Sequence, residues 1–202
     1  MAAIKELYFC TGNRHKFNEV AEFFNGTLKV IQADLDITEP RGESFEEIAK
    51  SCAKQAYKKL KKPVFVEDSG LAIPSLGGFP GTYSAWVFKT LGNGGILKLL
   101  DGKTGAGRAA EFVSCIGFCD GKAIKTFNGI CKGIIAPNCR GNAGFGYDPI
   151  FQPAGHRWQQ PSRYAPIGAS DNETFAELGP GKLAISHRSI AVGAFQIYLR
   201  DY

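Results

Sequence analysis

The segment YFCTGNRHKFNEVAEFF, residues 8–24, indicates the fold class of this chain of 202 residues. Its first residues are apolar and predict a short buried strand over residues 7–10. Apolar side chains then recur with the i, i+3, i+4, i+7 spacing of an amphipathic helix, at Phe17, Val20, Ala21 and Phe24. A strand that enters a helix through a tight turn, here Thr11-Gly12-Asn13, is typical of an α/β protein.

A second helix is predicted to begin after Ser44, because Ser44 and Glu47 have the spacing of a capping box. Its apolar face comprises Phe45, Ile48, Ala49, Cys52, Ala56 and Leu60. Pro63 ends the helix, and a strand over residues 64–66 follows. The pair Glu67-Asp68 is then expected at the carboxyl end of that strand, which is where open α/β sheets bind ligands.

The second half of the chain predicts antiparallel strands and a last helix. Two long strand patterns between residues 108 and 135 are joined by Asp120-Gly121, a strong signal for a β-hairpin. One helix is predicted near residues 83–91, and residues 152–171 are predicted as a long loop. A last helix follows Ser186, with an apolar face that includes Ile190, Ala194, Ile197 and Tyr198. We expect residues 1–202 to form a single domain.

Composition limits the classes of function. With 44% hydrophobic and 21% charged residues, the chain can bury one sizeable core. The net charge of +5 is spread along the sequence, which suits an anionic ligand better than a stable nucleic-acid complex. No apolar run approaches the ~18 residues of a membrane span, and the first six residues hold no apolar signal segment. We therefore expect a cytoplasmic protein without membrane contact, whose six cysteines are mostly buried thiols.

The turn over residues 11–16 allows more than one interpretation. Backbone N–H groups at a helix N-terminus bind phosphate, and Arg14 and Lys16 would add positive charge. Alternatively, Asn13 or Thr11 caps the helix while the cations are solvated. Cys10 also precedes the turn as the nucleophile of a cysteine-dependent phosphatase would, although Lys16 stands where such a loop has Arg.

Four segments occur in a fixed order: TGNRHK (11–16), VEDSGL (66–71), FGYDP (145–149) and ISHR (185–188). With GGFPGTYSA between them, they resemble the inosine triphosphate pyrophosphatase family, which hydrolyses noncanonical purine nucleoside triphosphates. The resemblance covers essentially the whole chain. It implies Mg²⁺-dependent cleavage of XTP, ITP or dITP between the α and β phosphates, which yields the monophosphate and pyrophosphate. It also implies a homodimer of elongated, two-lobed α/β subunits, each with a long mixed twisted β-sheet flanked by helices and an active cleft between the lobes.

The resemblance gives the metal and catalytic roles to carboxylates. Asp68 would bind Mg²⁺, act as the proton acceptor for water, or do both, and Glu39 is expected to be the second metal ligand. Mg²⁺ usually takes one or two carboxylates and keeps several waters, so these residue types suit it. Only one of Glu67 and Asp68 is expected to face the metal.

Substrate contacts are expected from the other matching positions. The phosphates would be bound by Thr11, Gly12, Asn13, Arg14, His15, Lys16 and Lys182. Ser69 would donate to a phosphate or cap a turn. Phe145 would stack on the purine or lie in the core, with Gly146, Tyr147 and Asp148 beside it. His187 and Arg188 would meet the 6-keto oxygen of hypoxanthine or xanthine, where ATP presents an amino donor and loses a hydrogen bond.

The chain departs from the family pattern in two places. A phosphate-contacting lysine of many members falls on Ser51 or Cys52, with Lys50 and Lys54 as substitutes on other helix faces. The segment over residues 152–181 is also longer than expected. Two other classes of function stay open: a cysteine-dependent phosphatase that uses Cys10, and a noncatalytic nucleotide- or RNA-binding module, which the net charge of +5 permits.

Overall fold

The computed structural model describes residues 6–154 and 172–202. The strands are β1 (Glu6–Cys10), β2 (Lys29–Ala33), β3 (Val64–Ala72), β4 (Ala109–Cys119), β5 (Ile124–Ile135) and β6 (Phe151–Pro153). The α-helices are α1 (Arg14–Phe23), α2 (Phe45–Leu60), α3 (Ser84–Leu99), α4 (Phe175–Leu178) and α5 (His187–Arg200). Short 3-10 helices cover Pro74–Leu76, Gly81–Tyr83, Gly105–Arg108, Asp148–Ile150 and Gly179–Ala184.

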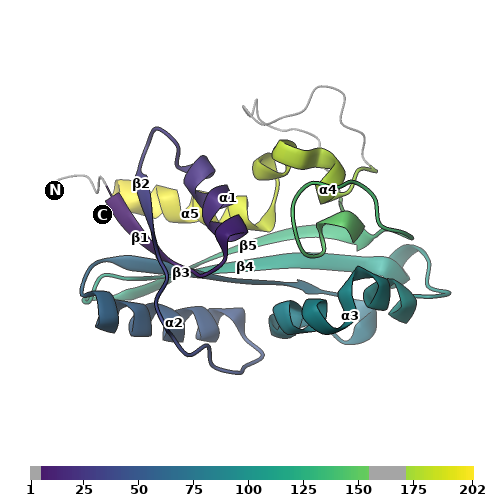
Figure 1. The fold of residues 1–202 in the computed structure, drawn as a ribbon, viewed down its shortest axis with the longest axis horizontal. Helices are drawn as coiled ribbons and strands as arrows, with labels where there is room; N and C mark the ends of the chain where they lie inside the picture. Colours follow the sequence, from purple (N-terminus) through teal and green to yellow (C-terminus); the bar gives the residue numbers. More distant parts are fainter. Residues whose placement is uncertain (1–5, 155–171) are drawn as a thin grey trace. The chain divides into compact units, whose positions relative to one another are not determined.

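The six strands form one sheet in the order β2-β1-β3-β4-β5-β6. Strand β1 pairs in parallel with both β2 and β3, whereas β5 and β6 are antiparallel. The predicted mixed α/β sheet flanked by helices is therefore confirmed (Figure 1). The predicted hairpin is also present, because Asp120 Oδ1 accepts the N–H groups of Lys122 and Ala123, both at 2.8 Å, in the turn between β4 and β5.

The chain divides into two compact units. The first unit comprises Met1–Ser69, Ser114–Gly129 and Arg188–Tyr202, and the second comprises Gly70–Val113 and Ile130–His187. Strands β3, β4 and β5 contribute residues to both units. The single domain, the elongated shape and the cleft between lobes stay predictions.

In the first unit, alternate residues of the strands belong to two separate cores. Helices α1 and α5 pack on one face of β1, β3 and β4, and α2 packs on the other (Figure 1). The core under α1 and α5 consists of Leu7, Phe9, Val20, Phe24, Phe65, Ile116, Phe118, Ala191, Val192 and Phe195. The core under α2 consists of Cys10, Ile48, Ala49, Cys52, Ala53, Ala56, Val64, Val66, Cys115 and Cys119. The predicted apolar faces of the first two helices are thus confirmed.

Helix α2 lies close to the sheet because Gly117 has no side chain. A Cβ at Gly117 would lie 2.4 Å from the carbonyl oxygen of Ala49, which is far inside van der Waals contact. At its N-terminus the helix is capped by Ser44, whose Oγ accepts the N–H of Glu47 at 3.3 Å. At the other end Lys61 adopts the left-handed conformation with φ 56°, two residues before Pro63. These features fix the ends of α2 where the sequence predicts them.

The described residues of the second unit share a core that joins α3, α4 and the adjoining parts of the strands. Its large side chains include Leu71, Ile96, Phe112, Phe151 and Phe175. Helix α3 is longer than predicted, because it continues past a non-helical residue, Gly92, to Leu99. The sequence stretch LGNGG hides this continuation, since glycine is a poor helix former.

Three expectations about element boundaries and faces are wrong. Glu67 and Asp68 lie inside β3 and not at its end, because the strand continues to Ala72 after its parallel pairing with β1 stops at Phe65. Helix α5 buries Ala191, Val192 and Phe195. Of the predicted face, Ile190, Ala194 and Ile197 are exposed, whereas Tyr198 packs against the core. Of the predicted loop, Gln152 and Pro153 belong to β6, and residues 155–171 lie outside the described residues.

Candidate active site

The turn before α1 is shaped by its own side chains. Asn13 is the N-cap, and its Oδ1 accepts the N–H groups of His15 at 3.0 Å and Lys16 at 3.1 Å. Thr11 Oγ1 in turn accepts the N–H of Asn13 at 3.1 Å. The expected cap is therefore confirmed, whereas Lys16 is not solvated as that interpretation expected, because it pairs with Glu67. Phosphate binding by this turn stays a prediction.

Strand β2 fixes the same turn from the other side. Gln32 Nε2 donates to the carbonyl of Thr11 at 2.9 Å, and Gln32 Oε1 accepts Arg14 Nη1 at 2.8 Å. A Cβ at Gly12 would lie 3.1 Å from Asp34 Oδ1, so the backbone passes close to that carboxylate. Gly12, Arg14 and His15 are exposed. The turn is thus ordered by protein contacts, with its outer surface open to solvent.

Lys16 points back from α1 to β3. Its Nζ lies 2.8 Å from Glu67 Oε2 and donates to the Glu67 carbonyl at 3.2 Å. The Lys16 side chain is 17% exposed, whereas the Glu67 side chain is 0% exposed. Two of the segments that carry the family resemblance, TGNRHK and VEDSGL, therefore meet in the first unit.

Arg188, at the start of α5, contacts the same carboxylate. Its Nη2 lies 3.2 Å from Glu67 Oε1 and donates to Ser69 Oγ at 3.0 Å, while Nη1 pairs with Glu19. Ser69 lies within β3, so no turn exists there for it to cap, and that alternative is wrong. Arg188 is buried, which ties its guanidinium group to these three partners.

Glu67 is held in its ionised form. Burial alone would raise its pKa, but Arg188 and Lys16 outweigh burial and keep the pKa of Glu67 well below its usual range. Ser114 Oγ also donates to Glu67 Oε1 at 2.6 Å. Since cations and a hydroxyl surround both oxygens, Glu67 is the carboxylate of the pair that is committed to protein partners.

Asp68 has a different environment. Burial raises its pKa to about 7, opposed by Lys16 and reinforced by the negative charges of Glu39 and Glu67. Its Oδ2 is buried and has no hydrogen-bond partner among the described residues. A buried carboxylate oxygen without a partner is costly, so it is a good candidate for a ligand or metal contact.

Glu39 is exposed in the loop between β2 and α2. Gln55 of α2 fixes the preceding residue, because it accepts the Thr38 N–H at 3.0 Å and donates to the Thr38 carbonyl at 2.7 Å. The described residues contain no cluster of three or more His, Cys, Asp or Glu side chains able to hold a metal. Glu39 and Asp68, whose charges interact, are carboxylates of the type that could hold Mg²⁺ together with waters and substrate phosphates.

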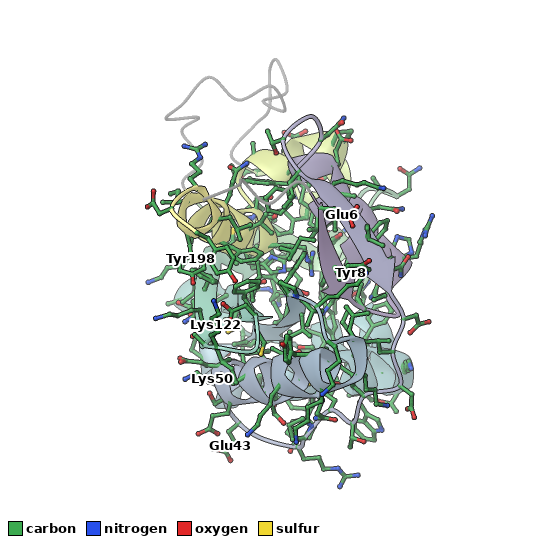
Figure 2. All side chains as sticks on the ribbon, turned by 90° about the vertical axis from the view of Figure 1, so that its left-hand side faces the viewer. Glu6, Tyr8, Glu43, Lys50, Lys122 and Tyr198 are labelled. Carbon is green, nitrogen blue, oxygen red and sulfur yellow. The ribbon has the colours of Figure 1, made fainter. Side chains whose placement is uncertain are left out.

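The missing lysine falls on Ser51 or Cys52, both in α2. Ser51 Oγ accepts Gln55 Nε2 at 3.4 Å. Cys52 is on the buried face of α2, where burial, with Glu39 and Asp68 nearby, raises the pKa of its thiol to about 12. Lys50, labelled in Figure 2, pairs instead with Glu46 at 2.6 Å, and Lys54 is exposed. At Cys52 the chain thus presents a neutral thiol beside the carboxylates.

Cys10 does not have the properties of a phosphatase nucleophile. It is buried, and burial raises the pKa of its thiol, with the charge of Asp34 acting in the same direction. A nucleophilic cysteine needs a lowered pKa, because the thiolate is the reactive form. The environment of Cys10 therefore disfavours the cysteine-dependent mechanism.

The segment FGYDP forms a second set of contacts in the other unit. Asp148 is buried, and its Oδ2 accepts both the Phe145 N–H and Lys182 Nζ at 2.8 Å. Lys182 Nζ also lies 4.9 Å from the centre of the Phe145 ring. Phe145 itself is only partly buried, so it is not a core aromatic residue. Lys182, predicted to contact phosphate, is placed here among the residues expected to hold the base.

Two further side chains complete this set. Tyr147 Oη donates to the Ser84 carbonyl at 3.1 Å, and its ring meets Phe88 edge to face at 5.3 Å. His187 is buried and stacks on Phe112, with ring centres 4.5 Å apart. Tyr147 therefore anchors the segment to α3, and His187 is held by aromatic packing in the second unit.

Sequence reasoning missed several residues that position the site. Glu19 pairs with Arg188, Ser114 donates to Glu67, and Gln55 holds the loop of Glu39. For Ser114 a signal was present, since it is a polar residue in the otherwise apolar stretch FVSCIGF. Glu19 and Gln55 carried no such signal, because polar residues on helices are usually solvated.

Comparison with known proteins gives a consistent result. The Ham1 family profile matches residues 7–198. The dITP/XTP pyrophosphatase of Methanopyrus kandleri is 45% identical over 199 residues, 97% of each chain, and that of Pyrococcus horikoshii is 40% identical over 96% of this chain and 97% of its own. Among solved structures, a HAM1 protein from Coxiella burnetii has a TM-score of 0.78 at 30% identity, covering 98% of this chain and all of its own. The Staphylococcus aureus Ham1 protein has a TM-score of 0.76 at 32% identity, covering 98% and 99%. This chain therefore belongs to the Ham1 family.

Proposed function

We propose that this protein hydrolyses noncanonical purine nucleoside triphosphates, XTP, ITP and dITP, to the monophosphate and pyrophosphate, and so removes them from the nucleotide pool. The observation that carries the proposal is Asp68, a partly buried carboxylate whose buried Oδ2 has no hydrogen-bond partner among the described residues, in electrostatic range of Glu39 and Lys16. The relatives from Methanopyrus kandleri and Pyrococcus horikoshii are named dITP/XTP pyrophosphatases, which supports the same class of substrate.

The triphosphate end is assigned to Lys16 and to the carboxylates Asp68 and Glu39. Lys16 is fixed in direction by Glu67, and with the turn over residues 11–15 it would neutralise phosphate charge. Asp68 and Glu39 would hold Mg²⁺, which when bound supplies charge neutralisation and a polarised water. Asp68, whose buried Oδ2 has no hydrogen-bond partner among the described residues, would also accept the proton of the attacking water. Because water is the nucleophile, no covalent intermediate and no thiolate are needed.

The base end is assigned to the segment FGYDP. Phe145 would stack on the purine ring, since its ring is partly exposed and its backbone is fixed by Asp148. We assign Lys182 to this end also, because its ammonium group is bound to Asp148 beside Phe145. His187 and Arg188 would recognise the 6-keto oxygen of the base, as the family resemblance implies. A site built for an acceptor at this position disfavours the 6-amino group of ATP.

The experiment is turnover of ITP with Mg²⁺, with separate detection of pyrophosphate and orthophosphate. We expect pyrophosphate and IMP from the wild-type protein, and a rate roughly 10³-fold lower from Asp68→Asn, since the proton acceptor and a metal ligand are both lost. Asp101→Asn, a matched change at an exposed aspartate, should keep full activity. Orthophosphate with IDP, or full activity of Asp68→Asn, would refute the proposal.

A homodimer and a cytoplasmic location form part of the same proposal. No helix in the described part of the chain is long and apolar enough to span a bilayer. Helix α3 exposes large apolar side chains, Trp86 at 67% among them, that a second subunit would cover. Light scattering of the purified protein should give about twice the mass of 21.8 kDa. A monomer that turns over ITP normally would refute the dimer alone.

A further inference from the structure

Helix α3 is interrupted at a single residue, and the next residue contacts the segment FGYDP. Gly92 has φ 60° and ψ −169°, which breaks the helical path and is accessible to glycine without strain. Asn93 follows this break, and its Nδ2 donates to the carbonyl oxygen of Gly146 at 3.1 Å. The interruption of α3 therefore presents one side-chain amide to the backbone next to Phe145.

The orientation of the Asn93 amide follows from this hydrogen bond. If the amide were rotated by 180°, its Oδ1 would face the Gly146 carbonyl, and two acceptors would oppose each other. In the observed orientation Asn93 Oδ1 is buried and has no hydrogen-bond partner among the described residues. A buried acceptor without a partner is unfavourable. The hydrogen bond that Asn93 Nδ2 donates to the Gly146 carbonyl explains it, because this bond fixes the amide with Oδ1 on the opposite side.

Gly146 is a point at which the segment would otherwise be free to change its conformation. Gly144 and Gly146 both have positive φ, 75° and 63°, and neither has a side chain that packing could hold. Asp148 fixes the segment at the N–H of Phe145, and Tyr147 fixes it at α3. The Asn93 amide holds the peptide between these two anchors. The position of the Phe145 ring thus depends on the backbone that Asn93 holds.

We propose that Asn93 is a positioning residue for base recognition: it fixes the Gly146 peptide and thereby the face that Phe145 presents to the purine. The inference rests on the proposed function, in which Phe145 stacks on the base. Asn93 does not touch the reacting atoms in this proposal. Its loss should weaken binding of the base in ground state and transition state alike, which raises KM and leaves kcat nearly unchanged.

The test uses the full-length protein and two substitutions at this site. Asn93→Ala removes the hydrogen bond, and Asn93→Asp replaces the donor with a carboxylate oxygen that repels the Gly146 carbonyl. We expect KM for ITP to rise about 5-fold in Asn93→Ala and further in Asn93→Asp, with kcat changed by less than about 2-fold. Asn128→Ala, at an exposed asparagine of β5, is the matched control and should leave both parameters unchanged.

Product inhibition separates positioning of the base from general loosening. The inhibition constant of IMP should rise by the same factor as KM, and that of pyrophosphate should not change. Unchanged IMP inhibition in both variants would overturn the inference, and so would an equal loss for IMP and pyrophosphate. If the wild-type protein does not hydrolyse ITP, the proposed function is wrong, and the inference about Asn93 is wrong as well. Wild-type turnover with unchanged Asn93 variants overturns the inference alone.

Discussion

Substitution of Glu67 by glutamine tests the network that fixes Lys16 and Arg188. The change keeps the size of the side chain and removes its charge. In the wild-type protein Glu67 Oε2 lies 2.8 Å from Lys16 Nζ, and Oε1 lies 3.2 Å from Arg188 Nη2. The Glu67 and Arg188 side chains are 0% and 3% exposed. Water therefore cannot solvate the Arg188 guanidinium group in place of the lost carboxylate. In the variant Arg188 keeps its ion pair with Glu19. Among the described residues, Lys16 keeps its hydrogen bond to the backbone carbonyl of residue 67 and loses its ion pair.

The expected cost follows from the burial of these groups. Breaking a buried ion pair by removal of one partner costs about 3–5 kcal/mol, because the remaining charge stays buried without compensation. In a chain of this length each kcal/mol lowers the melting temperature by about 2–4 °C, so a decrease of roughly 6–20 °C is expected. Typical domains are stable by about 5–15 kcal/mol, so from the middle of this range the variant should still fold at 25 °C.

Urea denaturation followed by tryptophan fluorescence and far-UV circular dichroism measures this cost. The matched control is Glu46→Gln, the same change in an exposed pair, whose Lys50 and Glu46 side chains are 47% and 43% exposed. The control should change stability by less than about 1 kcal/mol. The second control is a double-mutant cycle. Lys16→Met should lower the free energy of unfolding by less in the Glu67→Gln variant than in the wild-type protein, because the ion pair is already lost in that variant. If Glu67→Gln and Glu46→Gln have the same small effect, the reasoning from burial is refuted.

Three further predictions concern the thiol, the metal and the C-terminus. Cys10→Ser should keep ITP turnover within about 2-fold, because burial raises the pKa of the Cys10 thiol and the mechanism needs no thiolate; loss of activity in a folded variant would favour the cysteine mechanism. Treatment with EDTA should abolish turnover and added Mg²⁺ should restore it, while undiminished activity in EDTA would exclude a metal role for Asp68 and Glu39. Tyr202→Phe removes the 2.7 Å hydrogen bond to Asp120 and should cost about 1 kcal/mol at pH 8. Burial raises the pKa of Asp120, but the hydrogen bonds from Tyr202 and from backbone N–H groups outweigh burial, so the net pKa is lowered. The stability that this hydrogen bond contributes is therefore present above about pH 4 and is lost as the carboxylate protonates. Denaturation curves of Tyr202→Phe and wild type should therefore converge as the pH falls through the lowered pKa of Asp120, and a difference that persists once the carboxylate is protonated would contradict the assignment.

Local patterns were sufficient for elements whose sequence has one apolar face. The first two helices and the β-hairpin at Asp120-Gly121 follow from periodicity and turn chemistry alone. Helix α5 has two apolar stripes, one through Ile190 and Ile197 and one through Val192 and Phe195. Periodicity cannot choose between them, because the choice depends on which stripe packs against β1, β3 and β4.

The sequence predicts which residue types form the candidate site, but it predicts their arrangement and partners only in part. The VEDSGL segment was recognised, but its strand was expected to stop at two charged residues. The strand continues because Glu67 is neutralised by Lys16, 51 residues away, and by Arg188, which also bonds to Ser69 119 residues away. Such distant partners are not visible in a local pattern. The contact of Asn93 is missed for the same reason, because its partner Gly146 lies 53 residues away. In addition, the sequence LGNGG is typical of a flexible linker and does not indicate a break inside a helix.

Hydrolysis of ITP in ¹⁸O-labelled water, with mass spectrometry of both products, tests the assigned reaction most directly. Attack of water on the α-phosphorus places one ¹⁸O atom in IMP and none in pyrophosphate, and XTP and dITP should react in the same way while ATP and GTP react far more slowly. Label in orthophosphate or pyrophosphate, or equal turnover of ATP, would contradict a noncanonical purine pyrophosphatase that works through Asp68.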